Sequence, residues 1–357
     1  MRAAKLGNVA SLAWGLPSFR TPEHIRRAVS EAIRLDADLG KYTLPDGLPG
    51  LREVVARHHL ESFGIGVSAE QNVLITAGNM EGIKCLLGTI LGSGDEVIVT
   101  DPGFASHFQQ IRLSGGQPVY WPLDEAQDWS LNVDALPALI TKRTRALILV
   151  TPSNPTGKIF PREQLLRVAD IVRREDLLLI LDDPYSHFTY ENRDLYFNPA
   201  SIKELGANVA YLFTFSKCHA MSGWRLGYAV VPEDLKRQML KVHDAMLICA
   251  PRISQVAGLA ALNQMPLHLA EFEAVLEQRR HLICERLDRV PHVFTYVRPD
   301  GAYYVFPNIN TEHKNAVQFA SDLLENAGVC VTPGSAFGPH GEGHVRMAFC
   351  RPDDELN

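Results

Sequence analysis

The sequence has little that would direct it to a nucleic acid, a membrane or an oxidising compartment. Its formal net charge is −6, so it lacks the basic excess with which proteins bind nucleic acids or acidic membrane surfaces. It shows neither a secretory leader nor an apolar run long enough to cross a bilayer, so we expect no membrane partner and a cytoplasmic location. No repeat, low-complexity tract or Gly/Ser linker interrupts the chain.

Metal-binding and disulfide motifs are lacking too. The six cysteines are scattered, with no C-x-x-C pair, and the thirteen histidines contain no H-E-x-x-H. Reduced thiols are therefore expected, and neither a disulfide framework nor a metal site is predicted. What is present is ordinary for a globular protein that buries a large core: 357 residues, 46% of them hydrophobic and 21% charged.

The stretch Phe213–Tyr228, FTFSKCHAMSGWRLGY, is the most informative part of the chain. An apolar strand, Val209–Phe213, leads directly into Thr214, Ser216 and Lys217. Arg225 follows eight residues after the lysine, between two glycines. These polar residues are a poor choice for packing but suit a phosphorylated aldehyde, because an amine can form a Schiff base while hydroxyls and a guanidinium bind phosphate.

This block, T-x-S-K-x-x-x-M-x-G-x-R-x-G-Y, resembles the lysine signature of the fold-type I pyridoxal-phosphate (PLP) aminotransferases, the class I/II family. The resemblance extends over nearly the whole chain, from Gly15 to Arg346. It implies PLP as cofactor and Lys217 as the Schiff-base lysine. Thr214, Ser216 and Arg225 would bind the cofactor phosphate.

A second anion site is predicted within Asn72–Leu87, where a short strand leads through a glycine turn into a helix. Such a turn directs backbone N–H groups and the positive end of the helix dipole at an anion. We assign Gly78, Asn79 and Met80 to this phosphate cup; taken alone, the pattern equally fits a plain turn. A glycine pair at 92–94 precedes a strand instead of following one, so a dinucleotide-binding interpretation fails.

A buried carboxylate is predicted where the apolar strand Leu177–Leu181 ends in Asp182-Asp183-Pro-Tyr185. Such a carboxylate needs a partner that carries a proton or a charge. In the family, the D-x-x-Y spacing implies that Asp182 binds the protonated pyridine nitrogen of PLP and Tyr185 its ring hydroxyl. Asp183 is the alternative, and it could instead cap the next element.

Three more motifs match the family by position. The P-x-aromatic motif implies that Phe104 stacks on the cofactor ring, and the N-P-T-G motif implies that Asn154 binds the ring hydroxyl on the substrate side. The spacing of Tyr42, Gly47 and Arg52 matches a motif whose tyrosine reaches the phosphate of the neighbouring subunit's cofactor. A homodimer is therefore implied by the resemblance.

The substrate is expected at residues from the two ends of the chain. In the family, the glycine of G-x-P-x-F lies beside the substrate carboxylate, which implies Gly15, although alone it fits a turn glycine. The arginine of R-x-x-F binds that carboxylate as a bidentate fork, which implies Arg346. The substrate side chain is predicted to meet a mixed lining that does not choose between acidic, aromatic and aliphatic substrates: Trp14, Leu16, Phe19, His107 and Trp224.

The alternation of strands and helices predicts an α/β protein of fold-type I, with a large, mostly parallel sheet domain over residues 31–270. Residues 1–30 and 271–357 would form a smaller α+β domain. Because the chain begins close to Gly15 and ends eleven residues after Arg346, the N-terminal arm and the final helix of the family are expected to be short or absent. Further elements are predicted as helices at Glu233–Leu247 and Ala316–Ala327, a helix start capped by Thr21, and strands in Gly301–Pro307, Val331–Gly338 and His344–Phe349.

The resemblance implies a ping-pong aminotransferase that moves an amino group from an L-amino acid to a 2-oxo acid. Lys217 would act as general base and acid, and Asp182 would keep the cofactor ring protonated. Lyases, decarboxylases and cyclases on the same scaffold remain alternatives, because they use the same cofactor residues. A non-enzymatic regulator is disfavoured, since Lys217, Asp182 and Arg225 are all present.

Overall fold

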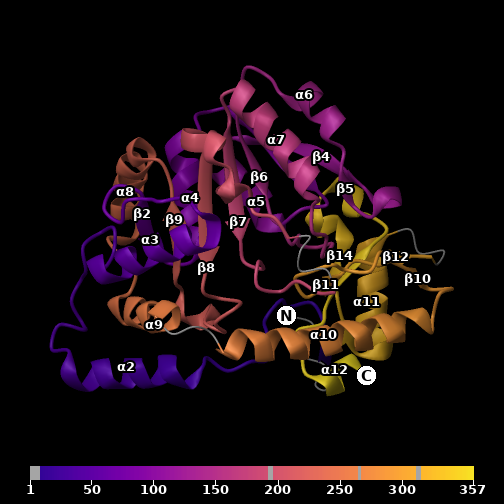
Figure 1. Ribbon diagram of the computed structural model, residues 1–357. Helices are drawn as coiled ribbons and strands as arrows, with labels where there is room; N and C mark the ends of the chain where they lie inside the picture. Colours follow the sequence, from indigo (N-terminus) through magenta and orange to yellow (C-terminus); the bar gives the residue numbers. More distant parts are fainter. Residues whose placement is uncertain (1–8, 192–195, 264–266, 311–314) are drawn as a thin grey trace.

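The structure is a computed structural model that describes residues 9–191, 196–263, 267–310 and 315–357. Its centre is an eight-stranded sheet of order β2-β9-β8-β7-β6-β3-β4-β5 (Figure 1). The strands are β2 Val73–Thr76, β3 Glu96–Asp101, β4 Gln117–Asp124, β5 Ser130–Leu131, β6 Thr144–Leu149, β7 Leu178–Asp183, β8 Val209–Thr214 and β9 Gly227–Val230.

The middle of this sheet is parallel: β4, β3, β6, β7 and β8 all run in one direction. The outer strands β2, β9 and β5 are joined by antiparallel pairs. Four of these strands, β3, β6, β7 and β8, are buried almost throughout, as expected for parallel strands covered on both faces, whereas β4 is half-buried or exposed along most of its length. The predicted mostly parallel α/β architecture is confirmed.

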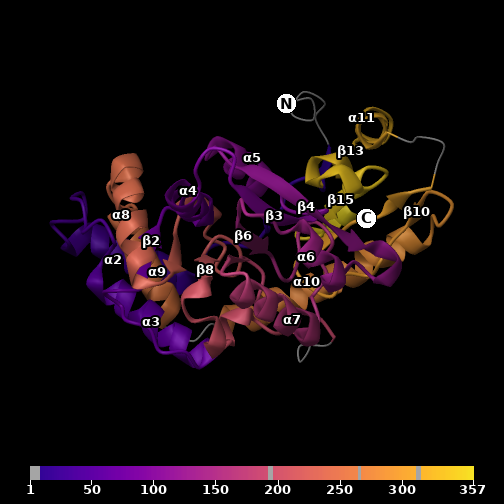
Figure 2. The same cartoon turned by 90° about the horizontal axis from the view of Figure 1, so that it is seen from above.

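Helices cover both faces of the sheet because alternate strand residues point to opposite sides. On one face Leu74, Ile148 and Leu212 pack against apolar residues of α4 Asn79–Ile90, α5 Ala105–Leu113 and α8 Glu233–Leu247. On the other face Ile75, Leu149 and Phe213 share a core with α3 Pro49–Phe63, α7 Arg162–Arg174 and α9 Arg252–Asn263. Figure 2 shows α5 and α7 on opposite sides of the strands.

A second set of short strands lies beside the large sheet. β11 Tyr304–Val305 and β14 Thr332–Pro333 flank β15 Val345–Ala348 in an antiparallel sheet. β1 Ala10–Ser11 pairs in parallel with β13 Val329–Cys330, and β10 Phe294–Thr295 pairs with β12 Asn308–Ile309. The surrounding helices are α10 Leu267–Asp288, α11 Ala316–Ala327 and α12 Asp353–Leu356, with α6 Leu136–Leu139 at the far edge of the large sheet (Figure 1).

The N-terminal segment touches both parts of the molecule. β1 pairs with β13, whereas the next helix, α2 Glu23–Leu35, packs on α9. The division into residues 31–270 and the remainder therefore stays a prediction. Among the described residues, no helix has both the length and the apolar character that a membrane span requires.

Two predicted strands are present but shorter than expected, and one predicted helix cap was wrong. The segment Gly301–Pro307 is strand only at Tyr304–Val305 and is buried throughout, because aromatic side chains pack on both of its sides. Val331–Gly338 leaves its strand after Pro333 and forms a 3₁₀ turn, Gly334–Phe337. Thr21 does not cap α2, because its hydroxyl donates to the Ala220 carbonyl and the helix begins after Pro22.

Candidate active site

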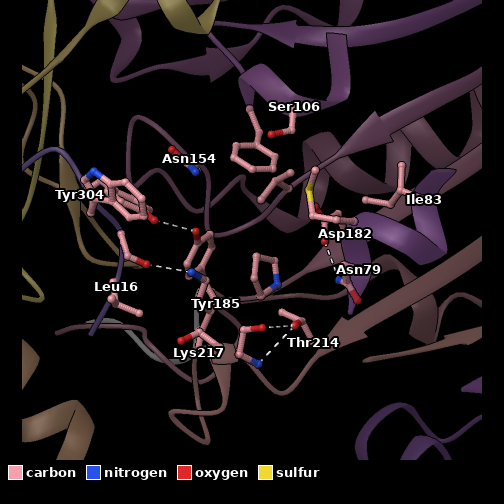
Figure 3. A pocket seen from close by; sticks show the side chains of 18 of the residues that line it. Leu16, Asn79, Ile83, Ser106, Asn154, Asp182, Tyr185, Thr214, Lys217 and Tyr304 are labelled. Carbon is pink, nitrogen blue, oxygen red and sulfur yellow. Dashed lines mark hydrogen bonds between the residues drawn. The ribbon is translucent and has the colours of Figure 1, made fainter. Parts of the chain in front are cut away.

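A cavity of about 770 Å³ lies at the carboxyl ends of the parallel strands, which is where open α/β sheets bind their ligands. Twelve residues predicted as site residues line it (Figure 3): Gly15, Asn79, Met80, Phe104, Asn154, Asp182, Tyr185, Thr214, Ser216, Lys217, Arg225 and Arg346. Two predicted site residues do not line the cavity. Gly78 caps α4 just behind it, and Tyr42 is 73% exposed elsewhere on the surface.

The end of β7 separates the two neighbouring carboxylates, because successive strand side chains point to opposite faces. Asp182 lines the cavity, where it accepts a hydrogen bond from Asn79 Nδ2 at 2.7 Å and lies 3.0 Å from His107 Nε2. Asp183 points away and accepts from the Tyr211 hydroxyl at 2.9 Å. Its burial raises the pKa of the Asp183 carboxyl to about 6. The geometry therefore favours Asp182 over Asp183 as the site carboxylate.

Lys217 lies in the turn that follows β8, and its amine points into the cavity. Nζ donates to the Gly15 carbonyl at 2.8 Å. The pKa of this amine falls from 10.5 to about 8, mainly because the group is buried and to a smaller extent because the guanidinium groups of Arg346 and Arg225 lie nearby. A lysine amine with such a pKa is partly neutral near physiological pH, and only the neutral amine is a nucleophile or a base.

Anion-binding groups gather on the far side of the lysine. The Thr214 and Ser216 hydroxyls lie 2.9 Å apart at the end of β8. Arg225, in a left-handed conformation, and the Gly78 turn at the N-terminus of α4 complete the group. A Cβ on Gly78 would lie 2.8 Å from the Arg225 guanidinium, and the residue has a φ of +85°, so this turn requires glycine.

Besides Arg225, a second arginine lines the cavity: Arg346, which belongs to β15. The Arg346 side chain is 7% exposed and lies between the rings of Tyr304 and Phe337, with Cζ 4.5 Å and 4.8 Å from their centroids. Its Nη1 donates to Asn154 Oδ1 at 3.0 Å, while Nε is buried without a partner among the described residues. The arginine is thus held rigidly and retains capacity to bind an anion.

Three tyrosines lie at the part of the cavity shared by Arg346, Gly15 and Lys217. The Tyr185 and Tyr304 hydroxyls are 2.9 Å apart, and the Tyr303 hydroxyl donates to the Gly15 carbonyl at 3.2 Å. A Cβ on Gly15 would lie 1.9 Å from the Tyr304 hydroxyl, so only glycine fits here. Burial raises the pKa of Tyr185 well above its usual value, so this residue stays a neutral phenol.

The predicted lining of the substrate side-chain pocket is only partly correct. Trp14 and Leu16 line the cavity, but Phe19 stacks on Phe272, and Trp224 donates to the Thr21 hydroxyl. His107 contacts the Asp182 carboxylate instead of the pocket. The sequence also gave no reason to choose several residues that do line the cavity: Ala13, Ile83, Ser106, Val150, Pro184, Ser222, Gly223, Tyr304 and Thr332.

The arrangement agrees with what comparison to known proteins finds. The family model "Aminotransferase class I and II" matches residues 8–357. The chain belongs to this aminotransferase family. The class I/II aminotransferase relatives include an aspartate aminotransferase of Pyrococcus horikoshii, 36% identical over 99% of this chain and 90% of the relative. Another is aromatic-amino-acid aminotransferase 2 of Thermococcus litoralis, 34% identical with 99% and 90% coverage.

A solved class I/II structure shares the fold throughout. The crystal structure of an aromatic aminotransferase from Pyrococcus horikoshii superimposes with a TM-score of 0.93 at 33% identity, covering 99% of this chain and 95% of that one. The predicted fold type and aminotransferase activity are therefore confirmed. The roles of the individual site residues stay predictions.

Proposed function

We propose that this aminotransferase holds PLP at Lys217 and moves an amino group between an amino acid with a neutral side chain and a 2-oxo acid. The observation that carries the proposal is the convergence of three groups in one cavity. The Lys217 amine has a lowered pKa, the Asp182 carboxylate ends the neighbouring strand, and Arg346 lies on the opposite side.

The residues present fit PLP. The Thr214 and Ser216 hydroxyls, Arg225 and the Gly78 turn offer donors to a phosphate, and the side-chain-free Gly78 leaves the approach open. Asp182 would hold the ring nitrogen, Phe104 would contact the ring face, and Asn154 and Tyr185 would bind the ring hydroxyl. When bound, PLP supplies an aldehyde that joins an amine covalently and a ring that withdraws electrons from the adjacent carbon.

The chain's own residues then account for proton transfer. Lys217 would hold the cofactor, and its amine, when free, would take the proton from the substrate Cα and later return a proton. Burial keeps this amine available in its neutral form because it lowers the pKa to about 8. Asp182 is held in place by Asn79 and His107, so its negative charge is fixed before the substrate arrives.

Arg346 would orient the substrate. Its guanidinium is packed between Tyr304 and Phe337 and bound to Asn154, so a carboxylate meets donors that need no reorganisation. Gly15 leaves room for the Tyr304 hydroxyl, and its carbonyl accepts a hydrogen bond from the Lys217 amine. Primary amines that lack a carboxylate should therefore react poorly.

The choice of a neutral substrate side chain follows from the charges in the cavity. Among the described residues that line it, the basic ones are Lys217, Arg225 and Arg346, and each already has a role. A second carboxylate on the substrate would find no remaining cation in this chain, and burying it unpaired would be costly. The rest of the lining suits an apolar or aromatic side chain: Trp14, Leu16, Met80, Ile83 and Tyr304.

A single-turnover experiment tests the proposal. The PLP-loaded enzyme is mixed with one amino acid at a time, without a 2-oxo acid, and the cofactor absorbance is followed. We expect the reaction to stop after one equivalent of 2-oxo acid is released, and added 2-oxo acid to restore the original spectrum. Phenylalanine and leucine should react at least about 10-fold faster than aspartate, since the cost of an unpaired buried charge exceeds ~1.4 kcal/mol.

Two outcomes would contradict the proposal. Faster conversion of aspartate than of phenylalanine would show that the acidic side chain finds a cation, for example from a second subunit. Continuous turnover without an acceptor, with release of ammonia or carbon dioxide, would place the chain among the lyases or decarboxylases. Phenethylamine, which lacks the carboxylate, serves as the control for the role of Arg346.

We also infer that the chain acts as a homodimer in the cytoplasm. Apolar side chains are exposed on α2, on the following loop and at the C-terminal end of α8, which supports burial against a second copy: Ile33, Leu35, Tyr42, Leu44, Met246 and Ile248. All six cysteines are free, which supports a reducing compartment. In this assembly Tyr42 would reach the cofactor phosphate of the partner subunit.

Replacing Tyr42 with phenylalanine should weaken cofactor binding without changing the preference among amino acids. The lost hydrogen bond to phosphate corresponds to about 1.5–3 kcal/mol, the usual range for bonds to charged groups. PLP titration of the cofactor-free protein measures the effect, with Tyr120→Phe as a control outside the cavity. Sedimentation that finds a fully active monomer would disprove the role of Tyr42.

A further inference from the structure

Behind the phosphate-binding turn lies a buried group of three side chains that the proposed reaction does not use. Glu81 and Cys85 come from α4, and His243 comes from α8. The Glu81 Oε1 atom lies 2.7 Å from Cys85 Sγ and 2.8 Å from His243 Nδ1. His243 and Cys85 are fully buried, and the Glu81 side chain is 12% exposed.

The other oxygen of this carboxylate contacts the turn itself. Glu81 Oε2 accepts a hydrogen bond at 3.1 Å from the backbone N–H of Ala77, the residue between the end of β2 and Gly78. Glu81 is the third residue of α4, a position from which a glutamate side chain can reach back to the backbone before the helix. It therefore fixes the peptide that leads into the Gly78 turn.

His243 holds the carboxylate in this position. A carboxylate can only accept, so His243 Nδ1 carries the proton that it donates to Glu81 Oε1. The residues are separated by 162 positions in the chain, so the contact joins α8 to the start of α4. Without it, the largely buried Glu81 carboxylate would keep only the weak Cys85 thiol donor on Oε1 and the Ala77 N–H on Oε2.

We propose that Glu81, oriented by His243, is a positioning residue for the anion-binding turn, so that this pair sets how tightly the enzyme holds the phosphate of its cofactor. The inference rests on the proposed function, because it takes the Gly78 turn as part of the phosphate site. Neither Glu81 nor His243 lines the cavity. Glu81 would act through its hydrogen bond to the Ala77 backbone N–H.

A metal ion is the other occupant that this chemistry could take, since one ligand atom of each residue lies within 4.8 Å of the others. The structure favours the hydrogen-bonded pair. Metal-bound histidines normally donate their second ring N–H to a partner, whereas His243 Nε2 is buried with no partner among the described residues. Burial also raises the pKa of the Cys85 thiol, which opposes the thiolate that a metal requires.

The experiment compares PLP with pyridoxal, which lacks the phosphate. Dissociation constants of both are measured with the full-length, cofactor-depleted wild type and with Glu81→Gln, His243→Phe and His243→Asn. The phosphate selectivity is the Kd for pyridoxal divided by the Kd for PLP. We expect this ratio to fall about 10-fold in Glu81→Gln and His243→Phe, because the phosphate loses the equivalent of one charge-assisted hydrogen bond. His243→Asn should keep the ratio, because its amide can donate to Glu81. Glu233→Gln, exposed in the first turn of α8, is the matched control.

The possible results are distinct. An unchanged ratio in both Glu81→Gln and His243→Phe, with wild-type circular dichroism, overturns the inference, as does a ratio that falls equally in His243→Asn and His243→Phe. If Glu81→Gln does not fold, the two His243 variants decide. One equivalent of Zn²⁺ bound by wild type but not by Cys85→Ser also overturns it. A wild type that binds PLP no better than pyridoxal would instead disprove the phosphate site of the proposed function, and this inference with it.

Discussion

Lys217→Ala should lose transamination almost completely while still binding PLP. Loss of proton transfer alone costs about 10²–10⁴-fold in rate, and the variant also loses the covalent attachment. The Thr214–Ser216 pair, Arg225 and the Gly78 turn are untouched, so the phosphate should still hold the cofactor. Steady-state kinetics and the absorbance of the bound cofactor measure the two effects separately.

Borohydride reduction and peptide mapping provide the direct check. The pyridoxyl group should be found on Lys217, and its appearance on Lys158 or Lys236 would refute the assignment. Lys203→Ala, at an exposed position, should behave as wild type. Because burial lowers the pKa of Lys217 to about 8, the neutral amine is already abundant above pH 8. The rate of PLP attachment to the cofactor-free protein should therefore level off near that pH rather than near 10.5.

Asp182→Asn should lower kcat by about 10²–10³-fold, the cost of removing one preorganised electrostatic group. The carboxylate now accepts from Asn79 and faces His107 Nε2, so its charge is fixed at the cavity floor. An amide of the same shape has no charge and cannot keep a ring nitrogen protonated. Stopped-flow measurement of the half-reaction with each substrate isolates this step from product release.

The neighbouring carboxylate supplies the control. Asp183→Asn changes the same chemical group on the same strand, but this side chain faces Tyr211 and Asn198 on the opposite side of the sheet. It should alter thermal stability and leave kcat close to wild type. If Asp183→Asn lost more activity than Asp182→Asn, the roles of the two residues would have to be exchanged.

The sequence predicts best where function depends on position along one strand. Lys217 and Asp182 each follow an apolar run that predicts a buried strand, and parallel strands bring their carboxyl ends to one edge. The choice between Asp182 and Asp183 came from the spacing to Tyr185, and the alternation of side chains in β7 places Asp182 at the cavity as predicted.

Contacts between segments that are distant in the chain could not be predicted from the sequence. His107 looked like a pocket residue, but α5 turns it onto Asp182, 75 residues away. Tyr304 had no motif of its own, yet it packs on Arg346 and contacts Tyr185. The shortened strand in Gly301–Pro307 has the same origin: it pairs only at Tyr304–Val305, because tertiary packing on both sides overrides the alternating pattern.

The pairing of β1 with β13 has a consequence for how the enzyme is made. Gly15 is synthesised long before β13 and β15, but the backbone around it is held by residues of those later segments. Leu12 N–H donates to Cys330, Ala348 N–H donates to the Leu12 carbonyl, and Ser11 N–H donates to Glu355. The parallel strands are all complete by Thr214, so we expect the large sheet to form first, whereas the substrate side of the site must wait until residues 330, 348 and 355 have been synthesised. A nascent chain stalled before residue 329 should thus already hold cofactor without recognising an amino acid.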